Sequence, residues 1–371
     1  MGTVDELIDP AVVSRLRASF RAVSPTLDLA ALTRAEDGVV GARLRQRVDI
    51  VRDALLDDLP SGFDATARLV SDVLDQPAFA GWMIWPTTEL VATRALESGS
   101  VAHFDEALAL LSRLTVGLTS EFAVRDLLIA RPLRALDVMH SWTEHDDQHV
   151  RRLASEGSRA YLPWARRVPW LIAHPRATRR ILDRLYRDPS EYVRRSVANH
   201  VNDLSRIEAA VATDAASHWA AHPDGTTARL VRHALRTLVK RADARALELV
   251  GFRGANLQVS RPQTSGRRVR WNDGVTFSSV VTNHGDAEAT VAIDYSIGFR
   301  RANGSVGSKT FKLTSRRLAA GESTTVSKSH SFRPRTTRTY YPGLHSVTVQ
   351  ANGVLSAPAD FVLEADGGRA S

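Results

Sequence analysis

Two segments of the sequence place charged and polar side chains at the same spacing. Residues 150–159 read VRRLASEGSR and residues 193–203 read VRRSVANHVND, an offset of 43 residues. In each segment three polar residues stand at i, i+4 and i+7, so each set lines one face of a helix. The first set is Arg152, Glu156 and Arg159, and the second is Arg195, Asn199 and Asn202. Arginines on such a face bind phosphate, whereas an acid among them stabilises positive charge.

The positive charge of the chain is concentrated around these segments. Between Arg151 and His200 there are twelve Arg, no Lys and four acids, a net charge of +8 that equals the formal charge of the whole chain. A local field of this kind indicates a polyanionic partner, and arginine favours planar, bidentate contact with phosphate. The sequence therefore predicts a basic surface that binds a polyanion.

The segments that must position these residues have helical periodicity. In the second copy Val193, Val197 and Val201 follow one another on a different face, which we expect to be buried. A related segment follows about one repeat later, at 230–241, and another precedes, at 121–128. Helical units that recur every 40 to 47 residues or so are typical of HEAT or armadillo-like repeats, in which one helix of each pair faces a shared concave surface.

The composition changes near Gly251. The sequence before it is rich in Ala, Leu, Arg and Asp, whereas Thr, Ser and Val alternate with period two after Phe252, with frequent turn signals such as Asn303-Gly304. This pattern predicts an immunoglobulin-like β-sandwich that lacks the Cys pair of antibody domains. We therefore expect a mainly α protein with a HEAT-like helical repeat solenoid at 1–250 and a β-sandwich domain at 251–371.

Several classes of protein are excluded or disfavoured. The chain has no Cys, which excludes disulfides, Cys-ligated zinc and thiol chemistry and makes a reducing cytoplasm the expected setting. The N-terminus lacks the pattern of a signal peptide, and no apolar run approaches the length that crosses a bilayer. His145 and His149 stand at i, i+4, but without a third ligand we predict no metal site. We expect no cofactor, no membrane contact and a monomer.

The segments described above resemble a known family. The stretch from Trp142 through VRRLASEGSRAYLPW (150–164) and YVRRSVANHVND (192–203) resembles the AlkC branch of the AlkC/AlkD alkylbase DNA glycosylases. SEFAVRDLL (120–128) and YYPGLHSVTVQANG (340–353) are similar too. The resemblance implies a base excision repair enzyme that hydrolyses the N-glycosidic bond of N3-alkylated bases, 3-methyladenine and 3-methylcytosine, in double-stranded DNA. It also implies that the damaged nucleotide is not swung into a pocket, unlike in most glycosylases.

The chemistry of that reaction assigns roles to the residues. An N3-alkylated base already carries positive charge and leaves as a neutral molecule, so the site needs stabilisation of charge on the deoxyribose and a positioned water rather than a strong acid. We assign Trp164 to the sugar or lesion, through cation–π attraction, and Glu156 and Asp203 to charge stabilisation and the water. Glu121 is carried over from the family segment. The residues expected to hold flanking phosphates are Arg152, Arg159, Arg194, Arg195, Asn199 and Asn202.

Each assigned catalytic residue also has a structural alternative. Glu156 could pair with Arg152 one turn earlier, although this is the poorer orientation in an isolated helix. Asp203 could be a surface residue at a helix end, and Glu121 could complement a helix N-terminus. Trp164 could pack between repeats.

A non-catalytic HEAT scaffold that binds nucleic acid or a protein is the alternative function, because helical solenoids mostly bind. A phosphate-binding surface gains nothing from Glu156 or Asp203, whereas a site for a cationic sugar requires such groups. Other tryptophans, among them Trp82 and Trp85, have apolar neighbours and are predicted to belong to the core. The relative rates on different lesions and the carboxylate that positions the water stay open.

Overall fold

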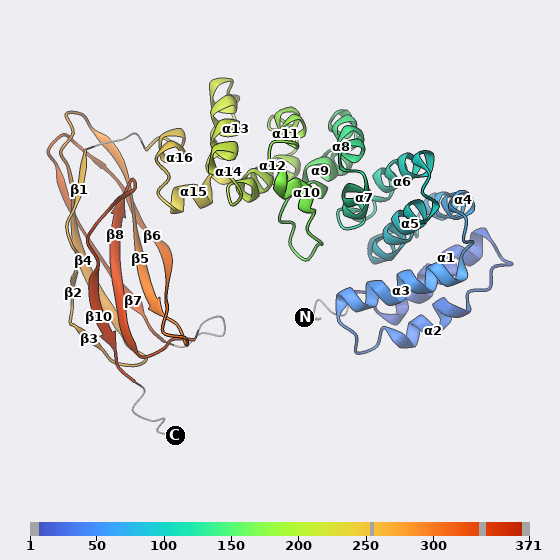
Figure 1. The fold of residues 1–371 in the computed structure, drawn as a ribbon, viewed down its shortest axis with the longest axis horizontal. Helices are drawn as coiled ribbons and strands as arrows, with labels where there is room; N and C mark the ends of the chain where they lie inside the picture. The colour runs from blue at the N-terminus through green and yellow to red at the C-terminus, as the bar shows by residue number, and fades with distance from the viewer. Residues whose placement is uncertain (1–6, 253–255, 334–338, 366–371) are drawn as a thin grey trace. The chain divides into compact units, whose positions relative to one another are not determined.

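The computed structural model describes residues 7–252, 256–333 and 339–365. The chain forms two compact units, Met1–Ala234 and Leu235–Ser371. Helices make up the first unit, and the second combines two short helices with two β-sheets (Figure 1). This order confirms the predicted fold class of helical repeats followed by a sandwich.

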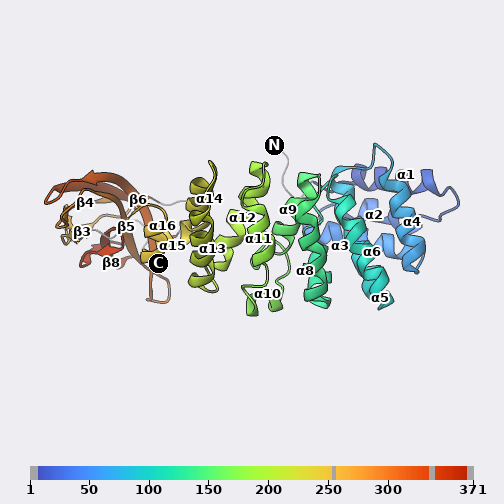
Figure 2. The same cartoon turned by 90° about the horizontal axis from the view of Figure 1, so that it is seen from above.

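The first unit is built from consecutive helices. They are α1 (Pro10–Val23), α2 (Ala30–Gly38), α3 (Leu44–Asp58), α4 (Phe63–Leu74), α5 (Ile84–Ser98), α6 (Val101–Leu114), α7 (Val124–Ala130), α8 (Pro132–Ser141), α9 (Gln148–Gly157), α10 (Pro169–Ala173), α11 (Arg179–Leu185), α12 (Glu191–Leu204), α13 (Ala209–Ala221) and α14 (Thr227–Ala234). Two 3₁₀ segments, Gly81–Met83 and Trp142–Glu144, precede α5 and follow α8. From α8 to α14 the helices run along a row, whereas near the N-terminus α4 lies beside α1 and α3 beside α5 (Figure 2).

Helix α12 shows how the sequence pattern produces this stack. Val193, Val197 and Val201 are fully buried, as their spacing predicts. The helix packs against α9 on one side and α14 on another, so two of its faces are covered. For this reason the polar residues Asn202 and Asp203 are buried as well, although their types alone would place them at the surface. Among the described helices, we find none with the length and hydrophobicity that a membrane span requires.

The second unit begins with α15 (Arg236–Lys240) and α16 (Ala244–Leu249), which pack against each other. Its strands are β1 (Leu257–Val259), β2 (Gln263–Thr264), β3 (Arg268–Val269), β4 (Gly274–Asn283), β5 (Ala289–Arg300), β6 (Val306–Leu318), β7 (Ser323–Ser331), β8 (Gly343–Ala351), β9 (Val354–Leu355) and β10 (Ala359–Leu363). The change from helix to strand thus falls after α16, whereas the compact units divide after Ala234. The ranges 1–250 and 251–371 stay a proposal for the functional domains.

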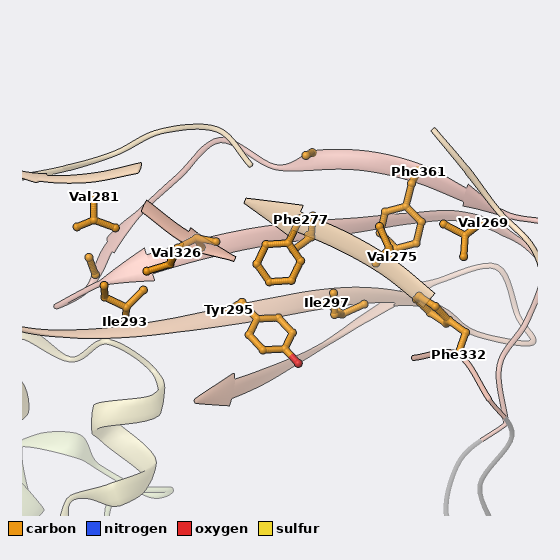
Figure 3. Packing of buried hydrophobic residues seen from close by; sticks show 14 of the residues in the cluster. Val269, Val275, Phe277, Val281, Ile293, Tyr295, Ile297, Val326, Phe332 and Phe361 are labelled. Atoms are coloured by element: carbon orange, nitrogen blue, oxygen red, sulfur yellow. The ribbon is translucent and has the colours of Figure 1, made fainter. Parts of the chain in front are cut away.

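The strands form two sheets. In the first, β4 pairs with β1, β2 and β7, and in the second the order is β3-β10-β8-β5-β6, with β9 beside β8. The pairing of β3 with β10 is parallel and the other ladders are antiparallel. Alternate residues of β4, such as Val275 and Phe277, point into the core, where Phe277 lies 5.0 Å from Tyr295 of the facing sheet, centroid to centroid (Figure 3). The period-two pattern therefore has the expected origin, which is two sheets that share one apolar interior.

Candidate active site

Glu156 and Asp203 lie in the last turns of two neighbouring helices. Asp147 begins α9 as its N-cap, where its side chain accepts a hydrogen bond from the backbone N–H of His149 at 2.6 Å. Glu156 is in the last turn of the same helix, and Asp203 is in the last turn of α12, which packs against α9. The stacking of one repeat on the next brings the two helix ends together.

Arg159 joins the two carboxylates directly. Its Nη1 donates to Glu156 Oε1 at 2.5 Å, and its Nε donates to Asp203 Oδ2 at 2.8 Å. The side chain is 9% exposed. The sequence assigned Arg159 to a phosphate, but in this structure the two acids occupy its guanidinium, because the helix ends converge on it. Its Nε and Nη1 donors are therefore engaged by carboxylates rather than by a phosphate.

Arg152 extends this arrangement to Glu121. Its Nη1 donates to Glu121 Oε2 at 2.9 Å, and its Nη2 lies 3.5 Å from Glu156 Oε1. The guanidinium also lies over the ring of Tyr192, 4.7 Å from the centroid. Five side chains thus alternate in charge, and we refer to them as the ion-pair chain: Glu121, Arg152, Glu156, Arg159 and Asp203. When all five are ionised, the ion-pair chain carries three negative and two positive charges.

The second oxygen of Glu156 is held from α12. Ser196 Oγ donates to Glu156 Oε2 at 2.6 Å and lies 3.0 Å from Ser155 Oγ. One turn further along α12, His200 Nδ1 lies 2.9 Å from the carbonyl oxygen of Ser155, and His200 Nε2 lies 3.1 Å from Thr178 Oγ1. Complete burial lowers the pKa of His200 to about 3, so the ring is neutral and its Nδ1–H donates to the carbonyl.

Burial also changes the acid–base properties of the charged groups. It raises the pKa of Asp203, and the hydrogen bond from Arg159 opposes this rise without cancelling it. Burial would by itself lower the pKa of Arg159, but the carboxylates of Glu156 and Asp203 raise it overall. Behind the ion-pair chain, burial and then the charge of Arg159 lower the pKa of Arg125 to about 10, which leaves it protonated at neutral pH. The site is therefore a desolvated set of opposite charges.

Trp164 stands at the rim of a pocket that reaches the ion-pair chain. The residue is 80% exposed and its φ is +63°, a left-handed conformation that is rare for a residue with a Cβ. The pocket measures about 290 Å³. It is lined by apolar and aromatic side chains together with three members of the ion-pair chain: Leu44, Trp82, Trp85, Leu118, Thr119, Glu121, Phe122, Glu156, Arg159, Leu162, Pro163 and Trp164. Asp203 does not line the pocket itself, but it accepts a hydrogen bond from Arg159, which does.

Trp82 and Trp85 line the pocket, although their apolar neighbours in the sequence predict core positions. Trp85 is buried, as expected of a core residue, and its Nε1 donates to Glu89 Oε1 at 2.8 Å. The same ring stacks on Phe122 with a centroid separation of 4.2 Å and lines the pocket. Trp82 is half-buried beside it. A core position and a pocket wall are compatible, and the spacing of these residues in the sequence carries no signal that separates the two.

The remaining arginines of the stripe face a second depression. Arg194 and Arg195 line a hollow of about 500 Å³ between α12 and α14, to which Arg229 and His233 also contribute. Glu191 lies in it as well, and its Oε1 accepts from Arg229 Nη2 at 2.8 Å and from Arg195 Nη2 at 3.4 Å. Arg195 and Arg229 are nevertheless largely exposed, with 63% and 79% of their side-chain surfaces free.

The two asparagines of the stripe are less accessible. Asn202 is buried and Asn199 is half-buried. Of the predicted phosphate contacts, Arg195 is exposed and Arg159 and Asn202 are buried. Arg152 and Arg194 are half-buried, and Arg194 Nη1 donates to the carbonyl oxygens of Asp188 and Pro189. Among the residues for which the structure gives positions, no group of three or more His, Asp or Glu side chains is arranged to hold a metal ion.

Comparison with known proteins relates the whole chain to one family. Residues 258–365 match the family model described as the C-terminal Ig-like domain of the uncharacterised protein YhaZ. The protein YhaZ of Bacillus subtilis (strain 168) is 33% identical over 320 residues, which cover 86% of this chain and 87% of YhaZ. The match to the domain model agrees with the sandwich that the alternating strands predict.

A solved structure matches over nearly the full length. It is the Pseudomonas fluorescens alkylpurine DNA glycosylase AlkC bound to DNA containing an abasic site analog, with a TM-score of 0.83 and 30% sequence identity. The match covers 98% of this chain and 100% of that one. Both units therefore have counterparts in a single related protein.

Proposed function

This chain belongs to the AlkC-type family, and we propose that it is a DNA glycosylase that hydrolyses the N-glycosidic bond of cationic N3-alkylated bases in double-stranded DNA. The observation that carries the proposal is the ion-pair chain, which places Glu121 and Glu156 in the lining of a pocket with Trp164. A surface that only binds phosphate has no use for carboxylates. The substrates we assign are 3-methyladenine and 3-methylcytosine.

The reaction needs little from the leaving group. When the bond between C1′ and the base nitrogen breaks, its electron pair stays on the base and neutralises the base's positive charge. The positive charge then develops on the deoxyribose, and water adds to C1′ with release of a proton. Glu156 and Glu121 are the carboxylates positioned at the pocket to stabilise that charge and to accept the proton. Asp203 holds the guanidinium beside them and adds negative charge at longer range.

Trp164 supplies an electron-rich face to the same cation. Because its indole is largely exposed, a sugar at the surface of a duplex can reach it without extrusion of the nucleotide. Cation–π attraction of about 0.5 to 2 kcal/mol would favour the charged sugar over the neutral one. This is the reason to expect excision without base flipping. Arg194 and Arg195 would hold the neighbouring phosphates. Such an enzyme works on chromosomal DNA, so we assign it to the bacterial cytoplasm at the nucleoid.

The first test measures release of bases from methylated duplex DNA by chromatography. We expect 3-methyladenine and 3-methylcytosine to be released, and Glu156→Gln to slow release on the order of a hundredfold while DNA affinity stays within about twofold. Glu144→Gln is the matched control, since Glu144 is an exposed carboxylate that pairs with Arg184 in the same unit. Unchanged release by both Glu156→Gln and Asp203→Asn would refute the catalytic assignment.

A second test separates catalysis from scaffolding. Duplexes that carry a neutral tetrahydrofuran or a cationic pyrrolidine at one abasic position differ in charge where the transition state becomes positive. We expect tighter binding of the cationic analog, and Glu156→Gln to remove that preference. Equal affinity for the two duplexes, with no base released, would instead favour a non-catalytic DNA-binding scaffold.

A further inference from the structure

We propose that Arg125 is a positioning residue that fixes the loop bearing Trp164, residues 158–168, at both of its ends. This loop connects α9 to α10 and contains no regular helix or strand. The role of Arg125 in placing Trp164 does not depend on what the protein catalyses. The effect of that placement on base excision rests on the proposed function.

One guanidinium makes three bonds to the backbone of this loop and its neighbours. Arg125 is 1% exposed and lies in α7. Its Nη1 donates to the carbonyl oxygens of Gly157, at 3.0 Å, and of Arg159, at 2.8 Å, where the loop begins. Its Nε donates to the carbonyl oxygen of Arg166, at 2.5 Å, where the loop ends. The base of the loop is therefore closed by a single side chain.

The next residue of α7 holds the same end of the loop. Arg166 Nη1 donates to Asp126 Oδ1 at 2.6 Å, so the backbone of Arg166 is bound by Arg125 and its side chain by Asp126. Val124 completes the contact on the other side, since a Cβ built on Gly157 would lie 2.7 Å from Val124 Cγ1. Three consecutive residues of α7 thus lie against the end of α9 or the ends of the loop.

Trp164 needs such support because its own surroundings provide little. Its backbone is in the left-handed region without being glycine, and such conformations persist only where the surrounding structure imposes them. Its indole is mostly exposed, so packing of the ring does not fix the residue. Closing the loop at its base restricts the conformations open to the residues between. Burial of Leu162 inside the loop adds one further anchor.

The chemistry requires arginine at this position. The guanidinium is a planar fork with five donors, and it can serve carbonyls that approach from different directions. Lysine keeps the charge but has one nitrogen at the end of a flexible chain, so it cannot hold both ends of the loop in the same way. Arg125→Lys is therefore the variant that separates the geometry from the charge.

The test observes Trp164 directly. The full-length protein is labelled with 5-fluorotryptophan, and the ¹⁹F resonance of Trp164 is assigned by its absence in Trp164→Phe. We expect that resonance to shift and broaden in Arg125→Lys. The matched control is Arg47→Lys, because Arg47 is also a buried arginine that donates to two carbonyls, those of Ala42 and Ile8, in a different helix. Arg47→Lys is expected to leave the Trp164 resonance in place.

A kinetic measurement accompanies the spectrum. Arg125→Lys should slow single-turnover base release on the order of tenfold to a hundredfold, with little change in affinity for abasic-analog DNA. A misplacement of a catalytic side chain by about 1 Å is enough to produce such a loss. Combined with Trp164→Ala, it should cause no further loss, because the two residues then act through one contact. Additive losses would contradict the proposal.

The two proposals fail in different ways. If the Trp164 resonance is unmoved in Arg125→Lys, or moves as much in Arg47→Lys, Arg125 is not the positioning residue, whatever the protein catalyses. If no base is released by any form of the protein but the resonance moves as expected, the proposed function fails and the role of Arg125 stands. Should Arg125→Lys not fold, Asp126→Asn loosens only the Arg166 end and is expected to shift the same resonance by less.

Discussion

Arg159 and Asp203 are 44 residues apart in the sequence, yet Arg159 Nε lies 2.8 Å from Asp203 Oδ2. Arg159 follows α9 and Asp203 lies at the end of α12, so the bond between them joins residues of two neighbouring repeats in one site. The same guanidinium binds Glu156, so it holds two buried acids in place before any ligand arrives.

We expect Asp203→Asn to lose activity without losing stability. Asparagine keeps an oxygen that can accept from Arg159 Nε but lacks the charge that the proposed reaction uses. Base release should fall on the order of a hundredfold at neutral pH. Because burial raises the pKa of Asp203, ionisation is less favourable in the native state than in the unfolded state, and removing the charge should leave the melting temperature equal or higher.

The pH dependence checks the sign of that effect. A carboxyl whose pKa is raised on folding binds its proton more tightly in the native state than in the unfolded state. Its contribution therefore favours folding at low pH and is lost as the pH rises from the ordinary Asp value through the raised one. The stability gain of Asp203→Asn, measured by denaturant unfolding, should grow across that window and then stay constant. A gain that is largest at low pH would contradict the assignment.

A second prediction concerns the arginines of the hollow between α12 and α14. Arg195→Ala and Arg229→Ala should each weaken binding to undamaged duplex DNA and reduce the slope of log affinity against log salt by about 1, which corresponds to one lost phosphate contact. Arg180→Ala is the control, since Arg180 is an exposed arginine of α11 that lies 3.3 Å from Asp137, measured from Nη1 to Oδ1. Equal slopes for all three variants would mean that the hollow does not contact the DNA backbone.

Much of the helical unit was predictable from periodicity, because burial follows the spacing of apolar residues. Val193, Val197 and Val201 are buried as expected. The pairing of Arg159 with Asp203 was not predictable, because it depends on how one repeat stacks on the next. For the same reason Arg125 went unnoticed within SEFAVRDLL, since its partners are backbone carbonyls that no sequence pattern marks.

The second unit shows a similar division. Alternation in β4 and β5 correctly predicts which residues face the interior, since a strand with one buried face must alternate. The parallel pairing of β3 with β10 joins residues almost a hundred positions apart, such as Arg268 and Val362, and local patterns do not encode it. Nor does the composition reveal that α15 and α16 belong to the same compact unit as the strands.

A third prediction follows from His200. In the native state burial lowers its pKa to about 3, while an unfolded chain has the ordinary value of 6.5. The unfolded state therefore binds the proton first, and the stabilising effect of the neutral ring is present above pH 6.5 and is lost as the pH falls toward 3. His200→Asn should flatten the dependence of stability on pH in this range by up to about 1.4 kcal/mol per pH unit. Thermal unfolding between pH 4 and 7 measures it, and identical slopes would show that the ring titrates normally.

The last prediction tests the contact between α7 and the end of α9. Gly157 is the final residue of α9, where alanine would ordinarily be the better helix former. A Cβ at this position, however, would lie 2.7 Å from Val124 Cγ1 and 3.2 Å from Met139 Cε. Val124 is a short, fully buried side chain with little freedom to move, so we expect Gly157→Ala to reduce the free energy of unfolding by about 1 to 3 kcal/mol.

Two variants make this result specific. Gly38 is also the last residue of its helix, α2, and a Cβ there would meet only Ile50 Cγ2, at an ordinary 3.4 Å. Gly38→Ala should therefore be neutral or stabilising by up to about 1 kcal/mol. Adding Val124→Ala should recover part of the stability lost in Gly157→Ala, because it removes the Cγ1 atom that the new Cβ would contact. If Gly157→Ala changes the free energy of unfolding no more than Gly38→Ala does, α7 and α9 are packed less tightly than the Val124 contact implies.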